Sequence, residues 1–204
     1  MLKIIQSAVV LIGVFLVIMV ALVIGNNAWR KKKVDTISRQ YIDKTYDFSY
    51  SIESIQYDYV MDNCRVEITP DVQYKEPRFT LILSGYAGEW HVVSDTFLQQ
   101  KVTEWLYQEW KDKVKALWGE NAKLGISINS PELCNLQTIN RNDYKIDDLL
   151  NCTFDRQVLL ISLEETSITD LPADTVLETI KAIQETSPKW DCLVIVSTDT
   201  YTGD

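Results

Sequence analysis

The sequence predicts an α+β protein that begins with a membrane-spanning helix, and three observations carry this prediction. First, the stretch from Ile4 to Gly25 contains no charged side chain. Second, apolar and polar residues alternate over short segments between Phe48 and Ser94, the period of half-buried strands. Third, the pattern changes to helical spacing from Phe97 to Trp118. The fold class is therefore an N-terminal transmembrane helix, an antiparallel meander packed on a long helix, and a C-terminal βαβ-like unit.

The stretch from Ile4 to Gly25 is long enough to cross a bilayer as a helix. At 1.5 Å per residue it spans roughly 30 Å, the thickness of the hydrocarbon core. The apolar core of a cleaved signal peptide is only about 7–15 residues long and precedes a small-residue cleavage site. Gly25-Asn26-Asn27-Ala28-Trp29 offers no such site, and Trp29 lies where interfacial aromatic residues are common. We therefore expect a retained anchor whose partner is the lipid bilayer.

The charges beside the anchor leave its orientation open. Arg30 to Lys33 follow the helix, whereas Lys3 and the α-amino group precede it. The positive-inside rule would keep the basic cluster, and the body after it, in the cytoplasm. A short N-terminal tail with Lys3 can also stay inside, as in an ordinary signal anchor, which would place the body outside.

The rest of the chain is acidic. Residues 1–33 hold five of the 20 basic residues and none of the 29 acidic ones, so residues 34–204 carry a net charge of −14. Such a body is repelled by phosphate backbones, so we expect no nucleic-acid partner. Its length allows one sizeable core or two small ones. The expected organisation is an anchor with its basic flank (1–33), a helix, meander and long helix (34–123), and an α/β unit (124–204).

Helical spacing continues after the anchor to Tyr46, and a period-two pattern then predicts a meander. The expected strands are Phe48 to Tyr59, Cys64 to Ile68, Arg78 to Ser84 and Glu89 to Ser94, with a hairpin loop at Gly85-Tyr86-Ala87-Gly88. Asp95 or Thr96 should cap the long helix from Phe97 to Trp118. Its aromatic stripe, which includes Trp105 and Trp110, is more typical of a ridge covering a sheet than of a ligand groove. We expect that face to pack against the meander.

The last third of the sequence reads as strands and a helix around a polar segment. The expected strands are Leu124 to Ile128, Arg156 to Leu163 and Asp191 to Ser197, and the expected helix runs from Pro172 to Glu185. The segment from Ser130 to Asp155 is polar, with either an inserted loop or a short helix over Ile146 to Leu150. Counted from Glu89, the order β-α-β-β-α-β is compatible with a ferredoxin-like split.

The four cysteines, Cys64, Cys134, Cys152 and Cys192, are widely spaced. No pair has C-x-x-C spacing, so a zinc ribbon or a thioredoxin-type motif is unsupported. Outside the cell they would allow two disulfides in three connectivities, and in a reducing compartment they would be buried thiols. We expect buried or unpaired thiols. Asn151-Cys152-Thr153 matches an N-glycosylation acceptor, a short motif that is frequent by chance.

No residue presents itself as a catalytic, cofactor-binding or metal-binding group. His91 is the only histidine, and its neighbours Ser94 and Asp95 lie on the same strand, where adjacent side chains alternate between faces. We expect a packed or surface histidine. Asp143, Asp147 and Asp148, near Asn140 and Asn142, could hold calcium, but their spacing does not fit the EF-hand loop, so we expect a solvated acidic loop. Nothing matches a nucleotide-binding glycine motif.

One known family has a similar layout. The N-terminal anchor, the basic helical continuation and Tyr41-Ile42-Asp43-Lys44-Thr45-Tyr46, which leads into a tyrosine-rich meander and a long helix, resemble the YfjL-like family of small membrane-anchored proteins of Gram-positive bacteria. The resemblance covers about residues 1–128 and concerns layout and aromatic texture. It implies a soluble part outside the membrane. The family has no established activity, so the resemblance implies no functional residue.

Two classes of function remain open. The first is a single-pass accessory or interaction protein of the cell membrane that binds another membrane or envelope protein and has no catalytic activity. The second is a membrane-anchored hydrolase that uses Asp or Glu carboxylates, a class with no diagnostic motif. A pocket with two or more converging carboxylates would favour the hydrolase, and a flat or aromatic-rimmed patch the interaction protein. The sequence favours the non-catalytic role.

Overall fold

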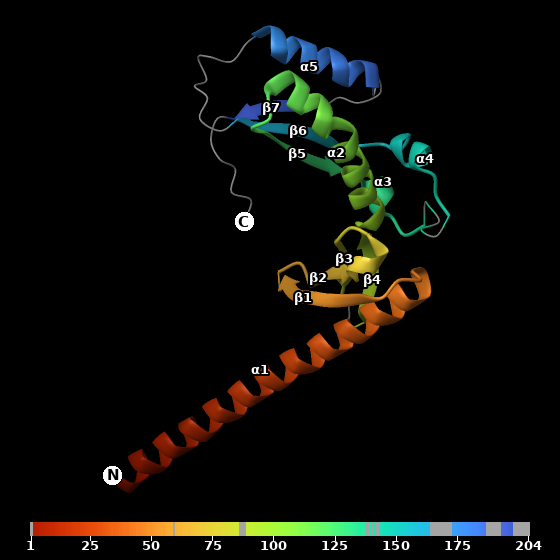
Figure 1. The fold of residues 1–204 in the computed structure, drawn as a ribbon. Coiled ribbons are helices and arrows are strands. Elements are labelled where there is room, and N and C mark those ends of the chain that lie inside the picture. The colour runs from red at the N-terminus through yellow and green to blue at the C-terminus, as the bar shows by residue number, and fades with distance from the viewer. Residues whose placement is uncertain are drawn as a thin grey trace.

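The structure, a computed structural model, describes residues 2–58, 60–85, 89–137, 139, 141, 143–163, 173–186 and 193–197. A long N-terminal helix leads into a four-stranded sheet, and a second helix connects this sheet to a three-stranded one (Figure 1). The fold is therefore α+β, as the sequence predicts, with an antiparallel first sheet.

The first helix, α1 (Leu2–Thr45), runs without a break through the predicted anchor and its basic flank into the body. Within the part of the chain that the structure describes, no helix combines the length and the apolar character needed to cross a membrane. Most side chains of the predicted anchor, Ile4 to Gly25, lie outside the described residues, so the anchor stays a prediction.

The predicted meander is confirmed. Its strands are β1 (Tyr50–Asp58), β2 (Asn63–Pro70), β3 (Phe79–Ser84) and β4 (His91–Asp95), in the order β1-β2-β3-β4, and each pairs antiparallel with the next. Of the predicted strand and loop residues, Tyr59, Tyr86, Ala87 and Gly88 lie outside the described part. The turn between β1 and β2 contains Asp62 at φ 46°, a left-handed conformation that aspartate adopts more readily than most residues.

The last turns of α1 pack against this sheet. Val34 and Ile42, two turns apart on one face of the helix, are fully buried and join the core formed by β2 and β3. Four aromatic rings close that core where α1 ends. Tyr46 stacks on Phe48 with centroids 5.0 Å apart and also lies against Phe79 and Phe97. The predicted helix over Val34 to Tyr46 is therefore a structural part of the first sheet.

The long helix α2 (Phe97–Trp118) has the bounds that the sequence predicts. Its fully or nearly fully buried residues form one stripe: Phe97, Leu98, Val102, Leu106, Trp110 and Val114. The expectation that this helix covers the meander is wrong for most of its length. Only its start meets the first sheet, through the contact of Phe97 with Phe79, whereas the helix packs mainly along β5 of the second sheet. The helix whose side chains join the core of the meander is α1, through its C-terminal turns.

The second sheet contains β5 (Ala122–Asn129), β6 (Arg156–Leu163) and β7 (Leu193–Ser197). β5 pairs antiparallel with β6, and β6 pairs parallel with β7. Helix α5 (Ala173–Thr186) connects β6 to β7, so the predicted βαβ unit is confirmed. The ferredoxin-like split is wrong, because β4 belongs to the first sheet and does not join β5 to β7.

The polar segment between β5 and β6 holds two short helices, α3 (Pro131–Cys134) and α4 (Ile146–Leu150). Ser130 caps α3, accepting a hydrogen bond from the Leu133 amide at 3.3 Å. Of the two alternatives for this segment, an inserted loop or a short helix over Ile146 to Leu150, the structure has the helix, α4. A single turn of 3-10 helix, η1 (Val72–Tyr74), follows β2.

Candidate functional site

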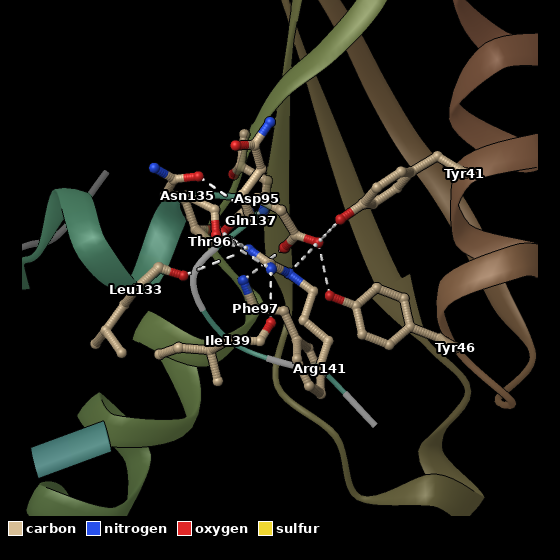
Figure 2. A network of polar contacts seen from close by, with 11 residues as sticks. Tyr41, Tyr46, Asp95, Thr96, Phe97, Leu133, Asn135, Gln137, Ile139 and Arg141 are labelled. Carbon is tan, nitrogen blue, oxygen red and sulfur yellow. Dashed lines mark hydrogen bonds and ion pairs between the residues drawn. The ribbon is translucent and has the colours of Figure 1, made fainter. Parts of the chain in front are cut away.

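The most concentrated group of polar contacts in the described residues surrounds Asp95, at the point where β4 ends and α2 begins (Figure 2). Asp95 is the last residue of β4 and has no solvent exposure. One carboxylate oxygen, Oδ1, accepts a hydrogen bond of 2.8 Å from the Phe97 amide, which satisfies an otherwise free donor in the first turn of α2. Of the two predicted capping residues, Asp95 therefore makes the contact, while the Thr96 hydroxyl accepts a hydrogen bond from the Thr80 amide.

The other carboxylate oxygen, Oδ2, accepts hydrogen bonds from three side chains. Tyr41 and Tyr46, both from the end of α1, donate their phenolic hydrogens at 2.8 and 2.6 Å. The guanidinium Nε of Arg141 donates at 3.2 Å and forms an ion pair with the carboxylate. We call Tyr41, Tyr46, Asp95 and Arg141 the Asp95 network. It joins α1, the β4–α2 junction and the segment between α3 and α4.

Arg141 is buried to the same degree as its partner. Its side chain is 2% exposed, and both of its terminal nitrogens donate to the backbone carbonyl of Asn135 at 3.3 Å. Longer contacts of 3.5 Å reach the carbonyls of Leu133, Ile139 and Asp95 (Figure 2). A buried cation needs both a counter-ion and acceptors for its remaining donors, and here it has both. The guanidinium thereby holds the backbone at Leu133, Asn135 and Ile139 close to Asp95.

The electrostatics of the Asp95 network keep its tyrosines protonated. Burial, followed by the negative charge of Asp95, raises the pKa of Tyr41 and of Tyr46 above the ordinary tyrosine value. Both phenols are therefore hydrogen-bond donors over the whole physiological range. Four donors converge on the Asp95 carboxylate, three of them on Oδ2 and one on Oδ1. Because the carboxylate is also fully buried, we infer that this arrangement positions the elements it joins.

A pocket of about 530 Å³ adjoins the Asp95 network. Aromatic and charged groups line it together: Asp43, Lys44, Thr45, Tyr46, Asp47, Phe48, Glu76, Phe97, Arg141 and Tyr144. Two of its three carboxylates are already engaged. Asp43 accepts a hydrogen bond from the Tyr50 hydroxyl at 2.9 Å, and Glu76 forms an ion pair with Lys101 at 3.0 Å.

The pKa values of Tyr50 and Lys101, which contact these two carboxylates, and of Tyr144 in the pocket wall are shifted. Burial, with the hydrogen bond to Asp43, raises the pKa of Tyr50 to about 12. Partial burial alone would lower the pKa of Lys101, but its hydrogen bond to Glu76 and the charges around it raise that pKa overall. Burial raises the pKa of Tyr144. Tyr50 and Tyr144 therefore stay neutral and Lys101 stays charged at physiological pH.

The residues that the sequence analysis weighed as catalytic are not brought together. His91 is exposed on β4, an edge strand, whereas Asp95 is completely buried. The aspartates weighed for calcium, Asp143, Asp147 and Asp148, are all exposed, and Asn140 and Asn142 lie outside the described residues. In the described part of the chain, no three His, Cys, Asp or Glu side chains are grouped to hold a metal ion.

Three of the four cysteines are described, and all three are free thiols. Cys64 is buried on β2, and that burial raises the pKa of its thiol to about 11. Cys134 and Cys152 are half-buried, and burial raises the pKa of both thiols. Thiols with raised pKa values are weak nucleophiles at neutral pH, because the thiolate is the reactive form. Cys192 lies outside the described residues.

Sequence reasoning missed the Asp95 network. The sequence predicts Asp95 as a helix cap and weighs it as a neighbour of His91, and it predicts only helical spacing up to Tyr46. Arg141 lies in an asparagine-rich stretch with no periodicity, and 46 residues separate it from Asp95 along the chain. The one usable signal is that Arg141 is the only cation between Lys123 and Lys145.

Comparison of the chain with protein-family models, with curated proteins and with solved structures finds no match in any of the three. The resemblance to the YfjL-like family therefore remains a prediction from layout. The candidate site is defined by its geometry alone: a buried network beside a mixed polar and aromatic pocket.

Proposed function

We propose that this chain is a single-pass membrane-anchored accessory or interaction protein. In this proposal Ile4 to Gly25 lies in the lipid bilayer, and the α+β body binds another membrane or envelope protein. The observation that carries the proposal is the continuity of α1, which runs from Leu2 to Thr45 as one helix. Its last turns are built into the core through Val34 and Ile42, so the tether and the body move together.

The Asp95 network supports a positioning role over a catalytic one. A catalytic carboxylate must reach a substrate and exchange a proton or form a bond with it. Asp95 is fully buried and accepts hydrogen bonds from Phe97, Tyr46 and Arg141, among others. These contacts hold the end of α1 against the start of α2. A tether fixed to the body in this way raises the local concentration of the body for a partner in the same membrane.

The side of the membrane on which the body lies is part of the same proposal. The resemblance to the YfjL-like family supports an extracytoplasmic body. The cluster Arg30 to Lys33 argues the opposite, because basic flanks are retained in the cytoplasm. An acidic body is repelled by nucleic acid in either place, so the partner is a protein or another envelope component.

Membrane extraction tests the anchor. The full-length chain is expected to stay with membranes after high-salt and carbonate washes and to float with lipid in a density gradient. Val17→Arg with Val20→Arg should release it, because a cation at the centre of a membrane helix costs about 2.5–3.5 kcal/mol in insertion. The matched control is Asn26→Arg with Asn27→Arg, which adds the same charge beyond the apolar stretch. Recovery of a soluble species beginning near Asn26 would overturn the proposal.

Protease accessibility tests the orientation. A membrane-impermeant protease added to intact, wall-stripped cells should remove the body and leave the anchor. If the body survives until the cells are lysed, Arg30 to Lys33 determined the orientation and the partner is cytoplasmic. The readout is the size of the fragment that remains, detected through an epitope at the N-terminus.

The pocket beside the Asp95 network favours one second candidate, the membrane-anchored hydrolase. Asp43, Asp47 and Glu76 all line that pocket, and a carboxylate pair is the minimum requirement of glycosidase-type chemistry. Asp47 is exposed and is the least engaged of the three. If purified protein hydrolyses a glycan or peptide of the envelope, Asp47→Asn should abolish the activity. The control Asp112→Asn, on an exposed face of α2, should leave it unchanged.

A further inference from the structure

The tip of the β1–β2 hairpin carries two exposed apolar side chains. Val60 is 92% exposed and Met61 is 69% exposed. The turn that presents them is well ordered by hydrogen bonds, because the Asp58 carboxylate accepts from the Val60 and Met61 amides at 2.9 and 3.1 Å. Asp62 completes the turn in a left-handed conformation. Its backbone carbonyl accepts a hydrogen bond from Gly85, which ties the tip to the neighbouring hairpin.

The direction of β1 places this tip on the side of the predicted anchor. β1 starts beside the end of α1, where the Tyr50 hydroxyl donates to Asp43. The strand then runs back toward the side of the N-terminal part of α1 and diverges from the helix as it does so (Figure 1). Nine residues of strand cover about 30 Å at 3.3 Å each. Since α1 rises 1.5 Å per residue, the level of Trp29 to Lys33 is roughly 15–21 Å from that of Asp43 along the helix axis. A strand of this length that diverges from the helix by a moderate angle reaches that level.

That level is the expected edge of the bilayer. If Ile4 to Gly25 occupies the hydrocarbon core, Trp29 to Lys33 lies about 6–12 Å beyond it, where the lipid headgroups are found. The same segment has an interfacial character of its own. Trp29 is exposed, and the Lys33 ammonium lies 5.0 Å from the centre of its ring. Because α1 is unbroken up to the buried Val34, the body has no hinge with which to swing away from the surface.

We propose that Val60 and Met61 insert into the headgroup region of the membrane that holds α1, as a second contact beside the anchor. This inference rests on the proposed membrane anchoring. The occupant of the tip is a zwitterionic lipid surface, because Asp58 and Asp62 flank the two apolar side chains and oppose anionic headgroups. The contact sets the tilt of α1 and holds the first sheet close to the bilayer.

The structure offers a matched control for this contact. Val72, in η1, is 92% exposed, the same fraction as Val60. It lies beyond the other end of β2, since β2 begins at Asn63 beside the tip and ends at Pro70, which pairs with Tyr50. Eight residues of strand separate the two positions, about 26 Å. A probe at position 72 therefore samples the far end of the same sheet.

The experiment places a dansyl-bearing amino acid at position 60 or at position 72 of the full-length chain. The chain is reconstituted in phosphatidylcholine vesicles that contain a lipid with a nitroxide near the top of its acyl chain. The expected result is a blue-shifted emission and a loss of intensity by nitroxide quenching at position 60, with neither change at position 72. Equal behaviour of the two probes would overturn the inference.

A second arm separates this inference from the proposed anchoring. Flotation of the labelled chain with the vesicles reports anchoring by itself. If the chain floats and the probe at position 60 is not quenched, the tip contact is wrong while the anchor stands; if the chain does not float, both are wrong. In a Met61→Asp variant the quenching at position 60 should fall while flotation and the melting temperature stay unchanged. Quenching that persists at full strength would contradict an insertion of the tip.

Discussion

The two sheets are fastened to their helices by different physical means. The first sheet meets α1 through the buried side chains of Val34 and Ile42 and also through two phenols, Tyr41 and Tyr46, which donate to Asp95 at the end of β4. The same carboxylate forms a buried ion pair with Arg141. The second sheet meets α2 through an apolar stripe that includes Leu106 and Val114.

The contact of α2 with α5 adds a side-chain hydrogen bond, from the Trp118 indole to the Thr179 hydroxyl at 2.9 Å. Apolar burial is non-directional and stabilises any close approach, whereas a network of donors and acceptors is satisfied in only one arrangement. The comparison suggests that the Asp95 network specifies how α1 meets the body, and that packing alone suffices inside the second sheet.

The largest effect is expected from breaking the ion pair of the Asp95 network. Arg141→Ala leaves a buried, uncompensated carboxylate and should lower the free energy of unfolding by about 3–5 kcal/mol. The measurement is denaturant unfolding of the full-length chain in mild detergent. The matched control is Arg39→Ala, because Arg39 pairs with Asp35 on the exposed surface of α1 at 3.0 Å. That pair should contribute only about 0.3–0.5 kcal/mol, and equal losses in the two variants would remove the distinction between the regions.

A comparable loss in the second sheet should come from cavity formation. Ile161 is fully buried on β6, and Ile161→Ala should cost about 2–5 kcal/mol through lost transfer energy and an unfilled cavity. Leu177→Ala removes a similar volume from an exposed position on α5 and should change stability by less than about 0.5 kcal/mol. A small effect of Ile161→Ala would mean that packing does not hold this sheet together.

The phenols of the Asp95 network should give a smaller loss and a characteristic pH dependence. Tyr46→Phe removes one donor from a buried carboxylate and should cost about 1–3 kcal/mol near neutral pH. The folded-state pKa of Tyr46 is raised above its unfolded value of about 10. Its contribution is therefore fully present below pH ~10 and is lost as the pH rises above that value.

Unfolding free energies measured below and above pH ~10 test whether the contribution of Tyr46 to stability is lost as the pH rises. The wild-type chain should lose stability steeply with rising alkalinity, and Tyr46→Phe should show a shallower slope. Tyr107→Phe is the control, since Tyr107 is exposed on α2. An identical slope in the wild type and in Tyr46→Phe would mean that the phenol is not buried against Asp95.

The smallest expected effect concerns the hydrogen bond between Trp118 of α2 and Thr179 of α5. Thr179→Val removes the acceptor of the Trp118 indole and should cost about 0.5–1.5 kcal/mol. Thr103→Val is matched to it, because each hydroxyl also donates to the carbonyl four residues earlier, Thr103 to Gln99 and Thr179 to Thr175. A loss in Thr179→Val no larger than that in Thr103→Val would indicate that the indole contact is neutral.

Local elements of this fold could be predicted from the sequence because their signals are local. α2 and β6 have the predicted bounds, and the period-two pattern located all four strands of the meander. The pattern could not say which sheet each strand joins. The apolar stripe of α2 fits either sheet, and only the tertiary structure assigns most of it to β5.

The Asp95 network was beyond the reach of sequence patterns for a similar reason. Periodicity and capping rules describe neighbours, whereas Arg141 and Asp95 are 46 residues apart and Tyr46 and Asp95 are 49 apart. Tyr41 falls at helical spacing with Val34 and packs against the core, but helical spacing does not indicate a partner for its hydroxyl. The only clue in the sequence is that Arg141 is the one basic residue between Lys123 and Lys145.

Because α1 is unbroken, the number of residues between the predicted anchor and the body sets how the body is rotated about the helix axis. Successive residues of an α-helix are rotated by about 100° about its axis. Inserting one residue between Gly25 and Val34 would therefore rotate the body by that angle relative to a protein fixed in the bilayer. Seven inserted residues complete nearly two turns and restore the facing while lifting the body by roughly 10 Å. The residue count of this short connector therefore decides which side of the body a neighbour in the membrane meets.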